Sequence, residues 1–162
     1  MLQALVNRGL RVGTFKCGPD YIDPMFHSRI IGAELVPFSP LADSRLPENI
    51  QVLYLGGGYS ELYAGQLSGN ASMWLSIKSA LTKGLPCIAE CGGFMYLTEA
   101  IADLPMVGYL PGKSFDNGKL TRFGYVRLRA EKDGLLCKAG VQTAFIILHQ
   151  YPYTMQSVGV QF

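Results

Sequence analysis

Short apolar runs alternate with segments of helical spacing through the first hundred residues. The apolar runs predict strands at residues 10–17, 33–38, 51–55 and 86–89. Helical spacing predicts the end of a helix over residues 2–8, and further helices over 61–67, 71–82 and 93–102. This alternation is typical of an α/β fold with a doubly wound, mostly parallel sheet. In such a fold the functional site lies at the carboxyl edge of the strands.

Two further features support the predicted helices. In the segment 71–82, apolar side chains recur every three or four residues and define one buried face; they are Met73, Trp74, Ile77 and Leu81. Gly9 and Gly84 follow the predicted helices at 2–8 and 71–82, where a glycine commonly ends a helix.

The pattern changes beyond residue 103. Residues 125–130 and 143–148 are predicted to form strands with no helix between them, which indicates an antiparallel extension. Residues 18–27 carry two prolines and two aspartates and are predicted to form an ordered loop.

Composition narrows the class of protein. The chain has 162 residues, of which 49% are hydrophobic and 16% charged, with a formal net charge of +2. We therefore expect a well-packed globular protein that binds neither nucleic acid nor a membrane. The apolar run at 144–148 is too short to span a bilayer, and the N-terminus lacks the features of a signal peptide. We read the four cysteines as reduced thiols of a cytoplasmic protein.

The segment IAECGGF, residues 88–94, has the parts of a nucleophile elbow. Cys91 stands between a predicted strand and two glycines that open a predicted helix. The positive end of a helix dipole favours a thiolate there, and the amide of Gly92 is free to bind an oxyanion. The glycine run 56–58 ends another strand and offers a second set of amides. A buried structural thiol beside a tight turn is the competing interpretation of Cys91, since most cysteines are of that kind.

Other polar residues near this segment leave their roles open. Glu90 could orient the site or a bound substrate, or it could be an ordinary hydrogen-bonded carboxylate. Cys87 and Cys91 have no second Cys/His pair at ligand spacing, so no metal site is expected.

The motifs resemble the cobyrinic acid a,c-diamide synthase family. The segments that carry the resemblance are KCGPDYIDPMFHSRIIG, AELVPFSPLADSRLPE, LYLGGGYSELYAGQLS, GLPCIAECGGFMYLTEAI, and MVGYLP followed by RFGYVRL. The resemblance implies a class I glutamine amidotransferase fold of the flavodoxin-like type. It also implies that Cys91 attacks the glutamine amide, and that Gly57, Gly58 and Gly92 form the oxyanion hole.

The same resemblance divides the chain into three parts. Residues 1–32 resemble a remnant of the family's ATP-dependent domain, 33–137 its glutamine amidotransferase domain, and 138–162 a divergent tail. No phosphate-binding loop of the G-x-x-x-x-G-K-[ST] type occurs in the sequence. The resemblance implies that roughly two hundred residues of the family's ATPase domain are absent at the junction between residues 32 and 33. We therefore expect no cofactor in this chain, although the intact family enzyme uses ATP and magnesium.

The tail departs from the family's closing motif, GHEFHYS, whose second histidine is the base. In the stretch LHQYPYT, His149 aligns with the first histidine and Pro152 with the catalytic one. His149 is the candidate base; a histidine at the edge of the core is the alternative reading.

Three hypotheses about function remain. The first is a glutaminase that supplies ammonia for corrinoid amidation, with glutamine as its partner and a corrinoid only where an ATP domain is intact. The second is a catalytically inactive fragment, and the third a docking subunit for a separate ATPase. A homodimer is compatible with each.

Overall fold

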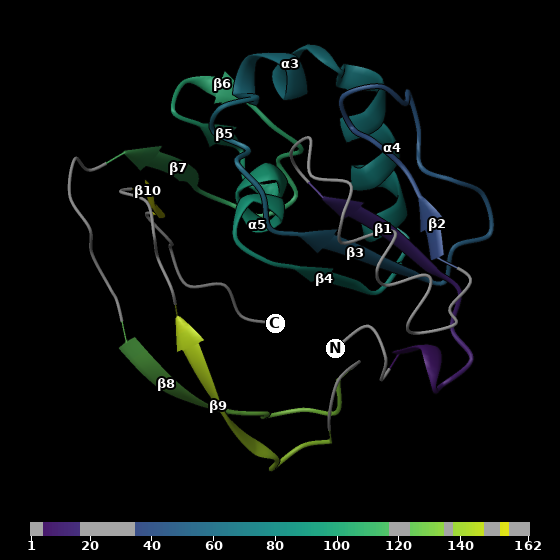
Figure 1. The fold of residues 1–162 in the computed structure, drawn as a ribbon, viewed down its shortest axis with the longest axis vertical. Helices are drawn as coiled ribbons and strands as arrows, with labels where there is room; N and C mark the ends of the chain where they lie inside the picture. The colour runs from purple at the N-terminus through teal and green to yellow at the C-terminus, as the bar shows by residue number, and fades with distance from the viewer. Residues whose placement is uncertain (1–4, 17–34, 117–123, 135–137, 148–152, 156–162) are drawn as a thin grey trace.

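A four-stranded parallel sheet forms the centre of the protein (Figure 1). The computed structural model describes residues 5–16, 35–116, 124–134, 138–147 and 153–155. The sheet contains β1 (Val12–Lys16), β2 (Leu35–Pro37), β3 (Val52–Gly56) and β4 (Cys87–Ala89) in the order β2-β1-β3-β4. This is the order of a flavodoxin-like sheet, so the predicted α/β fold class and these four strands are confirmed.

Three helices pack on the same face of this sheet (Figure 1). They are α3 (Ala64–Gly69), α4 (Ala71–Thr82) and α5 (Gly92–Leu97). Leu53 and Leu55 of β3 point into this main core, while Val12 and Val52 pack with Leu5 in a smaller cluster. The alternation along β3 thus separates two faces of one buried strand.

The α4 helix has the bounds predicted from its apolar spacing. Met73, Ile77 and Leu81 are buried, as that spacing requires. Gly84 has φ +90° and ends the helix: its N–H donates to Leu81 O at 2.9 Å, and the next N–H, of Leu85, donates to Ala80 O at 3.0 Å. Only glycine adopts this left-handed conformation readily.

Two predicted helices have different bounds. The helix predicted at 61–67 begins only at Ala64, because residues 60–63 form a turn in which the Tyr63 N–H donates to Ser60 O. The helix predicted at 93–102 ends at Leu97, so the prediction was wrong for its second half. Thr98 is extended there, and its hydroxyl donates to the carbonyls of Met95 and Ala100 at 2.6 and 3.1 Å. A side chain that competes for helix carbonyls in this way favours a helix end.

A second sheet follows α5 and was not expected from the sequence. Its strands, in spatial order, are β10 (Tyr153–Met155), β7 (Lys113–Asp116), β5 (Ala100–Ile101) and β6 (Leu104–Pro105). Strands of two to four residues are too short to produce a clear periodic pattern, which explains why the sequence does not reveal them.

The two strands predicted beyond residue 103 are confirmed and pair antiparallel, but they form a separate two-stranded sheet and not an extension of the parallel sheet. They are β8 (Gly124–Arg129) and β9 (Gln142–Ile147), with Gly124 opposite Ile147 and Arg129 opposite Gln142. In Figure 1 this pair lies away from the parallel sheet. Among the described residues, no helix is long and apolar enough to cross a membrane.

Candidate active site

Cys91 occupies a sharp turn between β4 and α5. It has φ +48° and ψ −117°, a backbone conformation that non-glycine residues rarely adopt and that costs on the order of 1–3 kcal/mol. The side chain is exposed, and its carbonyl accepts the first helical hydrogen bond, from Met95 N–H at 3.0 Å. A strained turn that presents a thiol to solvent at the end of a central strand is the arrangement of a nucleophile elbow.

The two glycines after Cys91 are required by close packing. A Cβ on Gly93 would collide with the carbonyl oxygen of Leu55 and lie 2.8 Å from that of Gly56. A Cβ on Gly92 would collide with Gly58 O and lie 2.6 Å from Ser60 Oγ. The start of α5 is thus pressed against the end of β3, and only glycine fits at either position.

The glycine loop after β3 lies directly beside Cys91. A Cβ built on Gly57 would be 3.5 Å from the Cys91 Cβ. In the described part of the chain, the amides of Gly57, Gly58 and Gly92 donate to no backbone carbonyl. Unused amides next to a thiol are what an oxyanion hole needs, and the structure brings all three predicted glycines together with Cys91.

The second thiol of this region has a different environment. Cys87 lies in β4 and is half-buried, and burial raises its pKa from 9.0 to about 12. Cys87 therefore stays protonated at neutral pH and is a poor nucleophile. Cys17 and Cys137 lie outside the described residues, as do His149 and Pro152.

Two polar residues of this region were not identified from the sequence. The Tyr54 hydroxyl, on β3, donates to Glu90 Oε2 at 2.8 Å. Ser60 is fully buried against Gly92, and its hydroxyl has no hydrogen-bond partner among the residues that the structure describes. Neither contact leaves a sequence signal, because each depends on how two separate segments pair.

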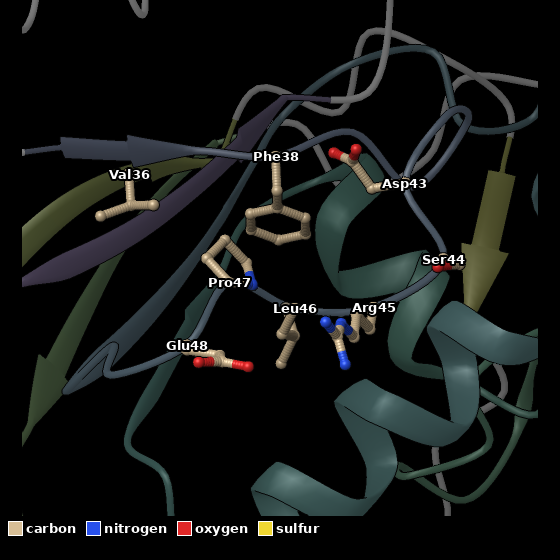
Figure 2. Close-up of a pocket in the computed structure, with 8 residues that line it drawn as sticks. All are labelled: Val36, Phe38, Asp43, Ser44, Arg45, Leu46, Pro47 and Glu48. Atoms are coloured by element: carbon tan, nitrogen blue, oxygen red, sulfur yellow. The ribbon is translucent and has the colours of Figure 1, made fainter.

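A pocket of about 420 Å³ lies elsewhere, over the loop that follows β2. Figure 2 shows the side chains that line it: Val36, Phe38, Asp43, Ser44, Arg45, Leu46, Pro47 and Glu48. Asn70 fixes this loop, since its side-chain amide donates to the carbonyls of Pro40 and Asp43, each at 2.7 Å. The residues that line the pocket include none of the predicted site residues.

Comparison with known proteins identifies the family. The sequence model of the CobB/CobQ-like glutamine amidotransferase domain matches residues 29–139. The chain belongs to this family. It is also similar to proteins named cobyrinate a,c-diamide synthase. The relative from Caldanaerobacter subterraneus subsp. tengcongensis is 46% identical over 129 residues, which are 76% of this chain and 28% of that protein.

Two further cobyrinate a,c-diamide synthases give the same result. The protein from Clostridium acetobutylicum is 46% identical over 109 residues, or 67% of this chain and 25% of its own length. The protein from Dehalococcoides mccartyi is 45% identical over 123 residues, or 73% of this chain and 27% of its own length. The chain therefore spans about a quarter of the length of these relatives.

Proposed function

We propose that this chain hydrolyses glutamine at Cys91 and supplies ammonia for the amidation of a corrinoid carboxylate in cobalamin biosynthesis. The observation that carries the proposal is the exposed thiol on a strained turn beside Gly57 and Gly92, in a domain of the glutamine amidotransferase family. The name of the relatives, cobyrinate a,c-diamide synthase, supports the corrinoid acceptor.

The chemistry proceeds in two steps. The sulfur of Cys91 attacks the carboxamide carbon of glutamine, and unpaired amides of the glycine loop and of Gly92 bind the oxyanion that forms. The carbon–nitrogen bond then breaks, the nitrogen takes up the proton of the thiol, and ammonia departs. A γ-glutamyl thioester remains on Cys91. Water hydrolyses the thioester, which releases glutamate and restores the thiol.

The acceptor half of the reaction is not assigned to these residues. ATP with magnesium would activate the corrinoid carboxylate in the intact family enzyme, but a phosphate cradle needs a glycine loop with a following lysine. The described loop, Gly56–Gly58, runs into Tyr59 and Ser60 instead. We therefore place no nucleotide in this chain and expect calorimetric titration to detect no ATP binding.

Ammonia release from L-glutamine tests the proposal directly. We expect the wild-type chain to release ammonia and Cys91→Ser to release none, whereas Cys87→Ala retains the wild-type rate because Cys87 stays protonated. A wild-type chain that releases no ammonia would favour the inactive fragment. Release that begins only when a separate ATP-binding subunit is added would favour the docking subunit.

The base is tested separately. A positioned base typically contributes about 10²–10⁴-fold to the rate, and Pro152 cannot accept a proton from the thiol. We therefore expect Pro152→His to raise ammonia release and His149→Ala to change it little. If His149→Ala abolishes a substantial native activity, His149 is the working base.

A further inference from the structure

Glu90 places a carboxylate one residue before Cys91 and is fixed there by β3. Its N–H donates to Leu55 O at 2.9 Å, which extends the pairing of β4 with β3 by one residue. Its Oε2 accepts the hydrogen bond from the Tyr54 hydroxyl at 2.8 Å. Tyr54 lies opposite Ile88 in the sheet, so the side chain of Glu90, two residues beyond Ile88, returns to the Tyr54 side.

The carboxylate of Glu90 keeps unused acceptor capacity. Its two oxygens offer about four lone-pair sites, and the Tyr54 hydroxyl occupies one of them. Among the residues that the structure describes, no lysine or arginine forms an ion pair with Glu90. The Glu90 carboxylate is half-buried, and its protein partner is a neutral hydroxyl. It can therefore also accept a hydrogen bond from a cationic group, and such a charge-assisted bond is the stronger kind.

We propose that Glu90 binds the α-ammonium group of the glutamine that Cys91 attacks, and that Tyr54 is the positioning residue for this carboxylate. The inference rests on the proposed function. Glu90 and Cys91 are adjacent in the sequence, and the Cα atoms of consecutive residues lie about 3.8 Å apart, a separation within the length of one glutamine molecule. In glutamine, three carbon atoms separate the ammonium nitrogen from the carboxamide carbon, so one molecule spans both groups.

The amide variant Glu90→Gln separates this role from a structural one. Its side-chain oxygen still accepts the Tyr54 hydrogen bond, so a residue that only anchors Tyr54 would be replaced without loss. Its charge is gone, so a residue that binds an ammonium group would lose its partner. Tyr54→Phe removes the positioning hydrogen bond and leaves the charge.

A pair of chloroketones that differ only in the amino group provides the measurement. L-2-amino-4-oxo-5-chloropentanoate carries the α-ammonium group, and 5-chloro-4-oxopentanoate lacks it. In both, the Cys91 sulfur displaces chloride, so a carbon–sulfur bond forms as the carbon–chlorine bond breaks. Mass spectrometry of the full chain gives the rate of labelling at Cys91 as a function of reagent concentration. Iodoacetamide, which carries no ammonium group, reports the intrinsic reactivity of the thiol.

We expect the wild-type chain to react about 10–100-fold more efficiently with the aminated reagent, the range typical of hydrogen bonds to charged groups. In Glu90→Gln this preference falls at least tenfold, through weaker binding of the aminated reagent. The iodoacetamide rate reports any change in the reactivity of the thiol itself, and such a change acts on both chloroketones alike, so it leaves their ratio unaffected. Tyr54→Phe loses part of the preference, and Glu90→Asp retains part of it. Thermal unfolding of each variant confirms that it is folded.

Two contrary results have different meanings. If Glu90→Gln keeps the full preference for the aminated reagent, Glu90 does not bind the ammonium group, and the glutamine site itself stands. If the wild-type chain shows neither preference nor saturation, no glutamine site exists at Cys91. That second result overturns the proposed function together with the inference.

Discussion

The parallel sheet and the β8–β9 pair are stabilised in different ways. Among the described residues, the core around the sheet runs from Leu5 to Leu110. The helices α3, α4 and α5 pack with Leu53 and Leu55 on one face of β3, and Leu5 packs with Val52 on the other. In the β8–β9 pair, Arg127 and Arg129 are exposed, and so are the described residues of the connecting loop, 131–134 and 138–141. Backbone hydrogen bonds join the two strands, and beyond them the Ala130 N–H still donates to Val141 O at 3.0 Å.

This difference explains why a strained turn such as that of Cys91 persists beside the parallel sheet. The strain of Cys91 persists because the buried ends of β3 and α5 determine its backbone. A two-stranded antiparallel pair is marginally stable by itself and could not impose such a conformation. We therefore expect substitutions in the two regions to differ in their effects on stability and on the thiol.

The largest effect is expected from a core substitution in α4. Ile77 is fully buried, and Ile77→Ala should lower the free energy of unfolding by about 2–5 kcal/mol, through lost apolar burial and a residual cavity. Leu75→Ala, on the same helix with 67% of the residue exposed, is the matched control and should cost well under 1 kcal/mol. Urea denaturation of both variants measures this, and equal losses would contradict the assignment of the core.

Gly93→Ala should damage the elbow itself. The added Cβ meets the backbone of Leu55 and Gly56, so β3 or α5 must move, at a cost of about 1–3 kcal/mol. Iodoacetamide labelling of Cys91 should change with it, because the turn loses its support. Gly65→Ala is the control: nothing lies within 4 Å of its Cβ, and in the α3 helix it should stabilise by about 0.5–1 kcal/mol. A stable Gly93→Ala variant with wild-type labelling would show that this contact does not position Cys91.

Because the pKa of the Cys87 thiol is raised, we expect the protein to lose stability in alkali. Its pKa rises from 9.0 to about 12 on folding, so the folded state holds the proton more tightly than the unfolded state. The free energy of unfolding is therefore unaffected by this thiol below pH 9. It falls as the pH rises from 9 towards 12, because the unfolded state loses the proton first. Cys87→Ala should show a shallower decline than the wild type across that window, in denaturation curves at stepped pH. Parallel declines would mean that Cys87 is not desolvated.

The smallest effect is expected in the loop between β8 and β9. Asp133 accepts hydrogen bonds from the Ala139 N–H at 2.9 Å and from Lys138 Nζ at 2.7 Å, and both lower its pKa. Because the ion pair is exposed, Asp133→Asn should leave the melting temperature and Cys91 labelling unchanged. Only the Ala139 amide should exchange its hydrogen faster. A global loss of stability would show that this loop belongs to the cooperative core.

The sequence predicted the features that have a local cause. The spacing of Met73, Ile77 and Leu81 reveals one face of α4, and Gly84 ends that helix because it adopts a positive φ. Cys91 between a strand and two glycines is a local signal too, so the turn could be predicted from the sequence.

Features that depend on pairing between distant segments could not be predicted. Thr98 ends α5 through hydrogen bonds to Met95 and Ala100, although the apolar spacing continues past it. The contact of Tyr54 with Glu90 requires the register of β3 and β4, which no local pattern contains. For the same reason, the apolar sequence of β3 gave no sign that the Tyr54 hydroxyl has a partner.

Asn70 makes two parts of the protein unfold as one unit. Its side-chain oxygen accepts the Met73 N–H at the start of α4, while its side-chain amide holds the carbonyls of Pro40 and Asp43. The loop over the pocket and the first turn of the helix thus share one side chain, so neither can open without breaking the hydrogen bonds of the other. In native-state hydrogen exchange, the amides of both should open with the same free energy.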